Sequence, residues 1–380
     1  MDQVADKLPL PQSPTIPLEE TCMSFTAQQL AEIDYRPKLP RSFRPNIGLI
    51  GCGGITKYHL QAYRDANLNV TALCDINVER ANSRRLEFFP AARVYDDYRE
   101  LLRDQSIEIV DITTHPPERP PIIEAALRAG KHVLSQKPFV LDLDVGQRLV
   151  ELADKCGKQL AVNQNARWAP HFSFARQVVA QGIIGDVFGA HLSCHWDHTW
   201  VKGTEFEFVK HLVLYDYAIH WFDMLRAVIP GQSAKRVFAS TARTRTQDLM
   251  PSLLGQVLIE FENAQGTLAF DAALPAGPQE RTFLSGTQGS LYSVGSGNQE
   301  QTLSVRLASG TWTPNLQGKW FPDGFRGTMG ELLCAIEERR ISSINAAENL
   351  DSLALCFAAV ASSELGKPIV PGTIRQLPAT

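Results

Sequence analysis

The stretch Ile47-Gly48-Leu49-Ile50 runs directly into Gly51-Cys52-Gly53-Gly54-Ile55-Thr56. An apolar strand that opens into small residues and then a helix is the arrangement that holds the pyrophosphate of a dinucleotide. Gly51 permits the tight turn, and Gly53 lets the backbone approach the phosphates. The helix expected to follow supplies unpaired N–H groups and the positive end of its dipole. The stretch therefore predicts a nucleotide-binding strand–turn–helix unit.

A second apolar run, residues 70–74, ends in Asp75. Asp75 lies 24 residues after Gly51, close to the spacing of about 20 typical of the acid that accepts the ribose hydroxyls. A carboxylate there repels a 2′-phosphate and favours NAD, although an aspartate that only caps a turn is the alternative. NADP also stays open, because three basic residues follow: Arg80, Arg84 and Arg85. The third glycine of the usual pattern is Thr56, whose branched side chain is expected to push helix and strand slightly apart.

Composition places the chain among ordinary globular proteins of two domains. It has 380 residues, 44% of them hydrophobic and 21% charged, and a net charge of −4, so no nucleic-acid or anionic-membrane partner is expected. The seven cysteines are scattered and form no CxxC pair, which indicates reduced thiols. No apolar run approaches the ~18 residues of a membrane span, and the N-terminus lacks the features of a secretory signal. A cytoplasmic protein is expected.

The pattern divides the chain into three parts. Residues 1–44 are Pro-rich and polar, with one short helix expected at 24–33, and form either a disordered leader or an ordered arm. Residues 45–164 alternate apolar strands with helices, which predicts a parallel sheet covered on both faces, a Rossmann domain that binds NAD. The strands are expected at 47–50, 70–74, 93–95, 109–113, 132–135 and 159–164, with helices at 57–66, 80–88, 97–104, 121–129 and 142–156.

Residues 165–380 have a different texture. After a helix at 170–181 come alternating stretches at 187–200, 236–243, 255–261, 267–273, 281–285 and 289–294, a hairpin turn at 263–266, and two closing helices at 327–340 and 346–366. Few helices interrupt these strands, which favours a large, mostly antiparallel open sheet. The predicted class is α/β: a doubly wound N-terminal Rossmann sheet followed by a C-terminal α+β domain for substrate binding and oligomerisation.

Ionisable residues stand at two places where a solvated surface is not expected. Lys137 follows a predicted parallel strand in Gln136-Lys137-Pro138, and ligands bind at the carboxyl ends of such strands. Asp216, His220 and Asp223 are spaced by four and three residues in a very apolar segment, which predicts one helical stripe. The alternatives are a solvated lysine, a core histidine and a capping aspartate, and Asp223 is interpreted as structural.

A cluster of aromatic and polar residues occupies positions 194–202. On a strand, His195 and Asp197 face one way while Trp196 and His198 face the other, which opposes a metal site because the ligands do not converge. Aromatic faces stack on the C–H surface of a sugar ring, although core packing accounts for them equally well. Arg167 and Trp168 follow another predicted strand. The candidate substrate contacts are Arg167, Trp168, His195, Trp196 and His198.

The chain resembles the Gfo/Idh/MocA oxidoreductases over residues 45–370. The resemblance is carried by the Gly51–Thr56 turn, Asp75, His115-Pro116-Pro117, the stretch 129–134, Gln136-Lys137-Pro138 and the pair Asp216 and His220. It implies a tightly held nicotinamide cofactor, a sugar or cyclitol substrate, and Lys137, Asp216 and His220 as the catalytic set. The family usually has Glu where this chain has Gln136. The implied cofactor contacts are Gly51, Gly53, Gly54, Ile55, Asp75, Thr114, His115, Pro116, Gln136 and Lys137.

The predicted function is an NAD(P)-dependent dehydrogenase that moves a hydride between the cofactor and a secondary hydroxyl of a sugar, cyclitol or related polyol. His220 is expected to take the hydroxyl proton because an imidazole titrates near the operating pH, and Lys137 to polarise the same oxygen. Two alternatives stay open: a glycoside-cleaving enzyme that oxidises its substrate transiently, and a non-catalytic nucleotide sensor. No metal is expected. An open sheet favours a homodimer or homotetramer.

Overall fold

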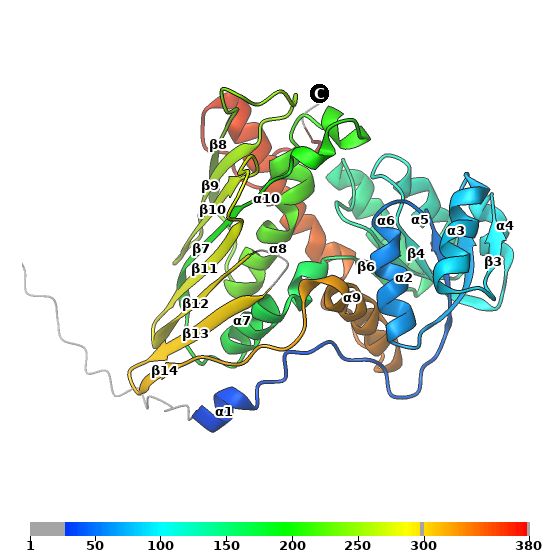
Figure 1. Ribbon diagram of the computed structural model, residues 1–380, viewed down its shortest axis with the longest axis horizontal. Coiled ribbons are helices and arrows are strands. Elements are labelled where there is room, and N and C mark those ends of the chain that lie inside the picture. Colours follow the sequence, from blue (N-terminus) through cyan, green and yellow to red (C-terminus); the bar gives the residue numbers. More distant parts are fainter. Residues whose placement is uncertain (1–26, 297–299, 378–380) are drawn as a thin grey trace, which may run out of the picture.

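The computed structural model describes residues 27–296 and 300–377. Its first sheet is parallel throughout, in the order β3-β2-β1-β4-β5-β6 (Figure 1). This is the strand order of dinucleotide-binding folds, in which the ligand lies across the carboxyl ends of β1 and β4, where the order reverses. The strands are β1 (Asn46–Ile50), β2 (Asn69–Cys74), β3 (Arg93–Tyr95), β4 (Ile107–Ile112), β5 (His132–Ser135) and β6 (Leu160–Val162).

Helices cover both faces of this sheet, and short polar side chains fix their ends. Asn77, Asp97 and Asp142 cap the helices that follow them by accepting backbone N–H groups of the first turn. Gly157 ends the last of them in the left-handed conformation, with φ +62°. The helices are α2 (Thr56–Asp65), α3 (Val78–Phe88), α4 (Tyr98–Arg103), α5 (Arg119–Arg128) and α6 (Leu143–Cys156).

The second sheet has eight strands in the order β14-β13-β12-β11-β7-β10-β9-β8. Only the central pair β7–β10 is parallel, so the expectation of a mostly antiparallel sheet is confirmed. The strands are β7 (Val187–His195), β8 (Arg236–Ala242), β9 (Leu254–Glu260), β10 (Gln265–Asp271), β11 (Gln279–Gly286), β12 (Gly289–Gly295), β13 (Gln301–Leu307) and β14 (Gly310–Trp312).

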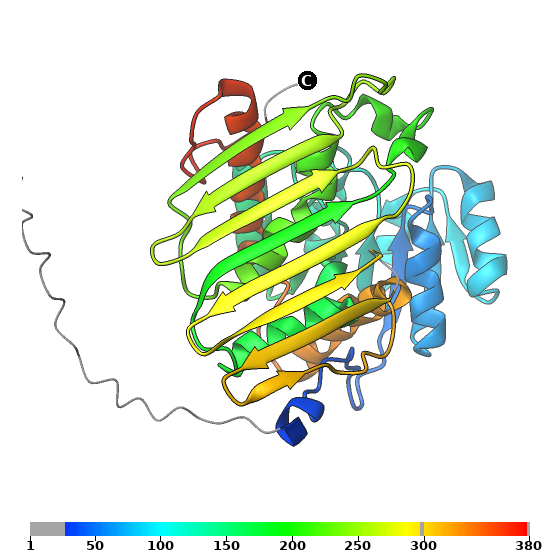
Figure 2. The ribbon, with the colours of Figure 1, turned by 60° about the vertical axis from the view of Figure 1, so that its left-hand side comes forward.

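One face of this sheet packs on the helices α7 (Pro170–Ala180), α8 (Ile219–Val228) and α10 (Ala346–Leu365) (Figure 1). Figure 2 shows the opposite face with no helix of the described chain across it. Strands β8, β9 and β11 alternate buried and exposed side chains along their length, as one-sided burial requires. The sheet is therefore open on the side away from the Rossmann unit.

A helix from the end of the chain belongs to the core of the first sheet. Helix α9 (Trp320–Glu337) packs along α2, and Phe325, Met329 and Leu332 share a buried cluster with Ile47 and Leu49 of β1. The two halves are thus tied by chain that returns from the second sheet to the first.

Several sequence expectations need correction at the level of individual elements. Strand β7 ends at His195 rather than at 200, because Asp197 accepts the N–H and hydroxyl of Thr199 and so starts the 3₁₀ turn η2 (Thr199–Val201). The turn expected at 263–266 lies at 261–264, where the Phe261 N–H donates to the Ala264 carbonyl. Strands β13 and β14 were not predicted.

The described part of the segment before β1, from residue 27, is an arm on the surface of its own chain. Within the described part of the helix expected at 24–33, α1 spans Ala27–Ala31, and residues 24–26 lie outside the described residues. The Glu337 carboxylate accepts the backbone N–H groups of Arg41, Ser42 and Phe43 at 2.7–2.8 Å. These bonds lower the pKa of Glu337 to about 2, so its stabilising contribution is present above its usual pKa of 4.5 and is lost as the pH falls toward 2.

Replacing Glu337 with Ala is expected to release the arm, because three backbone donors lose their common acceptor. Limited proteolysis with trypsin at pH 7.5 measures this after Lys38 and Arg41, because the bonds after Arg36 and Arg44 precede proline and resist trypsin. Cleavage after Lys38 and Arg41 should become faster in the variant, while the melting temperature of the remainder changes little. Equal cleavage rates in the variant and the wild type would contradict the role assigned to Glu337.

Candidate active site

The glycine turn leaves room for a phosphate group. Gly51 has φ +95°, and a Cβ placed on it lies 3.0 Å from the Thr114 nitrogen, so a side chain is excluded there. A Cβ on Gly53 or Gly54 meets no atom of the described chain within 4 Å. No side chain caps α2, so its first N–H groups are available to an anion. The turn fits the pyrophosphate predicted from the sequence.

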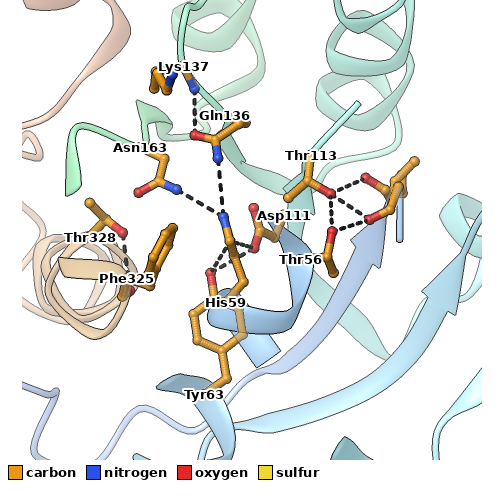
Figure 3. Close-up of polar contacts among 12 residues, drawn as sticks. Thr56, His59, Tyr63, Asp111, Thr113, Gln136, Lys137, Asn163, Phe325 and Thr328 are labelled. Atoms are coloured by element: carbon orange, nitrogen blue, oxygen red, sulfur yellow. Dashed lines mark hydrogen bonds and ion pairs between the residues drawn. The ribbon is translucent and has the colours of Figure 1, made fainter. Parts of the chain in front are cut away.

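Asp75 fastens this turn and lies beside it. Its carboxylate accepts the N–H of Cys52 at 2.7 Å and that of Asn77 at 2.8 Å, and Arg80 lies 3.7 Å away. A carboxylate offers about four acceptor positions, so capacity for ribose hydroxyls remains. The Thr56 hydroxyl donates to the Gly51 carbonyl at 2.9 Å (Figure 3). The third glycine is thus replaced by a residue that is hydrogen-bonded to the turn.

The ends of β4 and β5 are held together by a residue that the sequence analysis missed. Arg119, at the start of α5, is buried and donates to the carbonyls of Thr114, Gln136 and Pro138. Burial lowers its pKa to about 10. Nothing in the sequence distinguishes Arg119 from a surface arginine. The buried Thr114 hydroxyl has no partner within the described chain, which leaves it for a bound nucleotide.

Lys137 and Asp216 bring the two halves together. The Lys137 ammonium, just after β5, lies 3.2 Å from Asp216 Oδ2 and 2.9 Å from the Asp216 carbonyl oxygen. Their side chains are 17% and 18% exposed, so the pair is shielded but still reached by solvent. Nearby, His115 after β4 lies 3.0 Å from Glu205 and its ring contacts Phe206, both from the 3₁₀ turn η3 (Glu205–Phe208). The second half therefore reaches the predicted cofactor edge at two points.

The segment predicted to carry Asp216, His220 and Asp223 on one helical stripe is divided between two elements. A π-helical turn, η4 (Val213–Tyr217), holds Asp216 and precedes α8, which holds His220 and Asp223. Asp216 meets Lys137, whereas Asp223 pairs with Arg167.

His220 is held as a neutral base. Its Nδ1 lies 3.1 Å from Gln164 Oε1, an atom that only accepts, so Nδ1 carries the proton and Nε2 presents a lone pair. Burial, and then the charge of Lys137, lower the pKa of His220 well below 6.5. The ring therefore stays neutral across the physiological range, with its basic nitrogen free.

Aromatic side chains form a wall beside this group. Trp196 stacks on Tyr217 with ring centroids 3.8 Å apart, and Tyr217 stacks on Trp221 at 4.7 Å. The Trp196 indole N–H donates to His198 Nδ1 at 2.9 Å, so His198 carries its proton on Nε2. Burial, opposed by the charge of Asp216, lowers the pKa of His198 to about 4. Trp196 and His198 thus lie together on one side, as the alternation predicted.

Other candidate residues lie elsewhere. His195 lies 2.6 Å from Asp271, on the neighbouring strand β10. Trp168 lines a cavity of about 380 Å³ beside the arm residues Tyr35 and Lys38. Arg167 is buried and gives Asp223 two hydrogen bonds, at 2.5 and 2.8 Å. None of the three contacts Lys137, Asp216 or His220 in the described chain.

The sequence analysis also missed a cluster of buried polar residues next to Gln136. In it, His59, Tyr63, Asp111 and Asn163 are linked by hydrogen bonds (Figure 3). Two signals were present in the sequence: an aspartate inside the apolar run of β4, and the polar sequence that follows β6.

Replacing Arg167 with Met is expected to destabilise the fold without disabling the site. It leaves the buried Asp223 carboxylate uncompensated, which costs about 3–5 kcal/mol. Urea unfolding measures the loss, and the double variant Arg167→Met, Asp223→Leu should recover part of it. Activity per folded molecule is expected to stay within about tenfold of the wild type, since Arg167 contacts none of Lys137, Asp216 and His220 in the described chain. A larger loss in a fully folded variant would restore Arg167 as a substrate contact.

Comparison with known proteins agrees with this geometry. Residues 45–164 match the family described as an oxidoreductase family with an NAD-binding Rossmann fold, and residues 172–292 match the GFO/IDH/MocA C-terminal domain. The D-apiose dehydrogenase of Paraburkholderia graminis is 27% identical over 255 residues, 59% of this chain and 67% of that protein. The inositol 2-dehydrogenase of Paracoccus denitrificans is 29% identical over 183 residues, 47% of this chain and 53% of that protein.

Among solved structures, a levoglucosan dehydrogenase in complex with NADH and levoglucosan superposes with a TM-score of 0.77 at 21% identity, covering 87% of this chain and all of that one. This likeness concerns the fold. The two matched segments together take in well over half of the sequence. The chain belongs to the GFO/IDH/MocA family of NAD-binding oxidoreductases.

Proposed function

We propose that this protein is an NAD-dependent dehydrogenase acting on a secondary hydroxyl of a sugar, cyclitol or related polyol. The observation that carries the proposal is the meeting of Lys137 with Asp216 beside the neutral His220. A cation and a neutral base at the carboxyl end of the parallel sheet are what the oxidation of an alcohol requires. The D-apiose and inositol dehydrogenases among its relatives support the substrate class.

Bound NAD⁺ supplies the hydride acceptor. The residues that would hold it are the turn at Gly51, Gly53, Gly54 and Ile55, the carboxylate of Asp75, and Thr114, His115, Pro116, Gln136 and Lys137 at the ends of β4 and β5. The open space at Gly53 and Gly54, the uncapped α2 and the unpartnered Thr114 hydroxyl all fit this group.

The chain's own residues move the proton. His220 Nε2 accepts it from the substrate hydroxyl, and the Lys137 ammonium donates a hydrogen bond to the same oxygen as negative charge develops there. Asp216 orients Lys137 through the 3.2 Å contact. Trp196 offers its ring to a C–H face of the substrate, and His198 donates from Nε2. Arg167, Trp168 and His195 keep no role in this arrangement.

Two matched substitutions test the assignment. Lys137→Met removes the ammonium, and His220→Asn keeps a donor for Gln164 while removing the basic nitrogen. Each is expected to lower kcat/KM by about 10²- to 10⁴-fold, and NAD binding, followed by fluorescence, is expected to be retained in His220→Asn. Activity is measured as absorbance of the reduced nicotinamide over a panel of aldoses, cyclitols and sugar acids with both NAD and NADP.

The same panel separates the alternatives. Steady formation of NADH with a free polyol argues against a glycoside-cleaving enzyme, whose cofactor is regenerated in each cycle. Full activity in both variants would contradict the proposal and favour the non-catalytic sensor. We assign cofactor binding to residues 45–164 and substrate binding and oligomerisation to 165–380, although α9 packs on the cofactor part.

The open sheet supports a homodimer or homotetramer. Two pairs of apolar or aromatic side chains lie on its open face: Phe238, 43% exposed, beside Leu258, 44% exposed, and Phe283, 41% exposed, beside Tyr292. Thr267 and His191 stand between the two pairs in the register. An exposed apolar face of this kind is costly unless a partner covers it, and the same face on a second copy is the simplest partner.

The six cysteines of the described chain are free thiols, and no helix in that part is long and apolar enough to cross a membrane. The free thiols support our proposal of a cytoplasmic location.

The double variant Leu258→Lys, Phe283→Lys is expected to reduce the number of subunits, because it places like charges in the contact. Light scattering coupled to gel filtration measures the mass. The control Leu86→Lys changes an equally apolar residue that is 63% exposed on α3, away from the sheet. An unchanged mass in the double variant would contradict this interface.

A further inference from the structure

A buried chain of hydrogen bonds runs from the core of the Rossmann sheet to the backbone of Lys137 (Figure 3). Asp111 of β4 is fully buried, and its Oδ2 lies 2.7 Å from both the Tyr63 hydroxyl and His59 Nδ1. His59 Nε2 lies 3.1 Å from Asn163 Nδ2 and 3.4 Å from Gln136 Nε2. Gln136 Oε1 in turn lies 2.7 Å from the Lys137 nitrogen.

The hydrogen bond at Lys137 fixes which group donates and which accepts in every bond of this series. A peptide N–H can only donate, so Gln136 Oε1 is the acceptor and its NH₂ group faces His59. A donor at that place requires a lone pair on His59 Nε2. The ring proton therefore lies on Nδ1, where the Asp111 carboxylate accepts it. Asp111 therefore fixes the tautomer of His59. That tautomer fixes the orientation of the Gln136 amide, and the amide oxygen holds the backbone N–H of Lys137.

The imidazole of His59 is also fixed from the side. It is fully buried between α2 and α9, and its ring lies 4.5 Å from that of Phe325. Phe325 of α9 therefore packs on the ring and holds it next to Asp111 and Gln136. A ring held by packing and by hydrogen-bond partners at both of its nitrogens positions a neighbour far better than a mobile side chain does.

We propose that His59 is a positioning residue for Lys137: as the Nδ1–H tautomer, it orients the Gln136 amide and thereby the ammonium that meets Asp216. His59 itself touches neither Lys137 nor Asp216 in the described contacts, and acts through Gln136. The inference deepens the proposed function and rests on it for the catalytic consequence, while the hydrogen-bond polarity is independent of any reaction.

Two polar substitutions of His59 distinguish a role in positioning Lys137 from a role in the stability of the fold. In His59→Gln the side-chain oxygen takes the place of Nε2 and still accepts from Gln136. In His59→Asn the side-chain NH₂ takes the place of Nδ1 and still donates to Asp111, but nothing reaches Gln136. Each variant keeps the contacts of one ring nitrogen and loses those of the other, so similar losses of melting temperature are expected.

The kinetic expectation differs sharply between the two. His59→Asn should lower kcat by about 10- to 100-fold, the size of effect seen when the hydrogen-bond partner that orients a site residue is lost. His59→Gln should keep kcat close to that of the wild type. Equal kcat losses per folded molecule in both variants would overturn the proposal, because a purely structural role does not distinguish them.

Two measurements without substrate keep this test separate from the proposed function. Ring ¹⁵N NMR of the histidine-labelled wild type, with His59 assigned by its loss in His59→Gln, should show the Nδ1–H tautomer; the Nε2–H tautomer would overturn the proposal. Crystal structures should retain the Gln136 Oε1–Lys137 N bond in His59→Gln and lose it in His59→Asn. If both structural results hold but no polyol is oxidised, the proposed function fails and the positioning stands.

Discussion

The contact between the Lys137 ammonium and Asp216 is the interaction on which the account depends. Lys137 follows β5 of the parallel sheet, while Asp216 lies in a π turn that precedes α8 on the second sheet. Neither half contains a complete site. The contact requires that the chain after β5 present Lys137, that the π turn present Asp216, and that the two halves hold one fixed relation. Helix α9, whose apolar face packs on α2 and β1, supplies that relation.

The polar groups around this contact share one electrostatic pattern. His220 and His198 are buried beside charged neighbours, and burial lowers both pKa values, so each ring stays neutral, with its proton fixed by a single partner. Gln164 holds the proton of His220 on Nδ1, and Trp196 holds that of His198 on Nε2. One ring thus offers an acceptor and the other a donor. Buried neutral imidazoles whose tautomers are set by neighbours keep those roles across a wide pH range.

Much of the fold follows from the sequence because its signals are local. Near-continuous apolar strands, capping residues such as Asn77 and Asp142, and glycines such as Gly157 mark the elements of the Rossmann sheet. Strands β13 and β14 pair with their neighbours in the sequence at the edge of the sheet. They escaped prediction because only Leu303 and Val305 of β13 are buried and β14 has three residues, so the alternation is weak. The π turn at Asp216 is produced by tertiary packing and leaves no trace in residue spacing.

Candidate site residues could be recognised in the sequence where a reactive side chain stands at an informative position. They could not be recognised where only tertiary packing determines the contacts of a side chain. Lys137, Asp216 and His220 carry reactive groups at strand ends or in apolar surroundings, so they stood out. Arg119 looks like any arginine until its three carbonyl partners are seen. Arg167 looked like a ligand contact, but the partner that occupies it, Asp223, lies 56 positions further along the chain. The roles assigned to individual site residues remain predictions.

The most direct measurement is a crystal structure of the protein with NAD⁺ and a polyol that it oxidises slowly. The account predicts the pyrophosphate over Gly53 and Gly54, and one substrate hydroxyl within hydrogen-bond distance of both the Lys137 ammonium and His220 Nε2, with its C–H directed at the nicotinamide ring. A nucleotide bound elsewhere, or a lysine and a histidine too far apart to reach one oxygen, would contradict it.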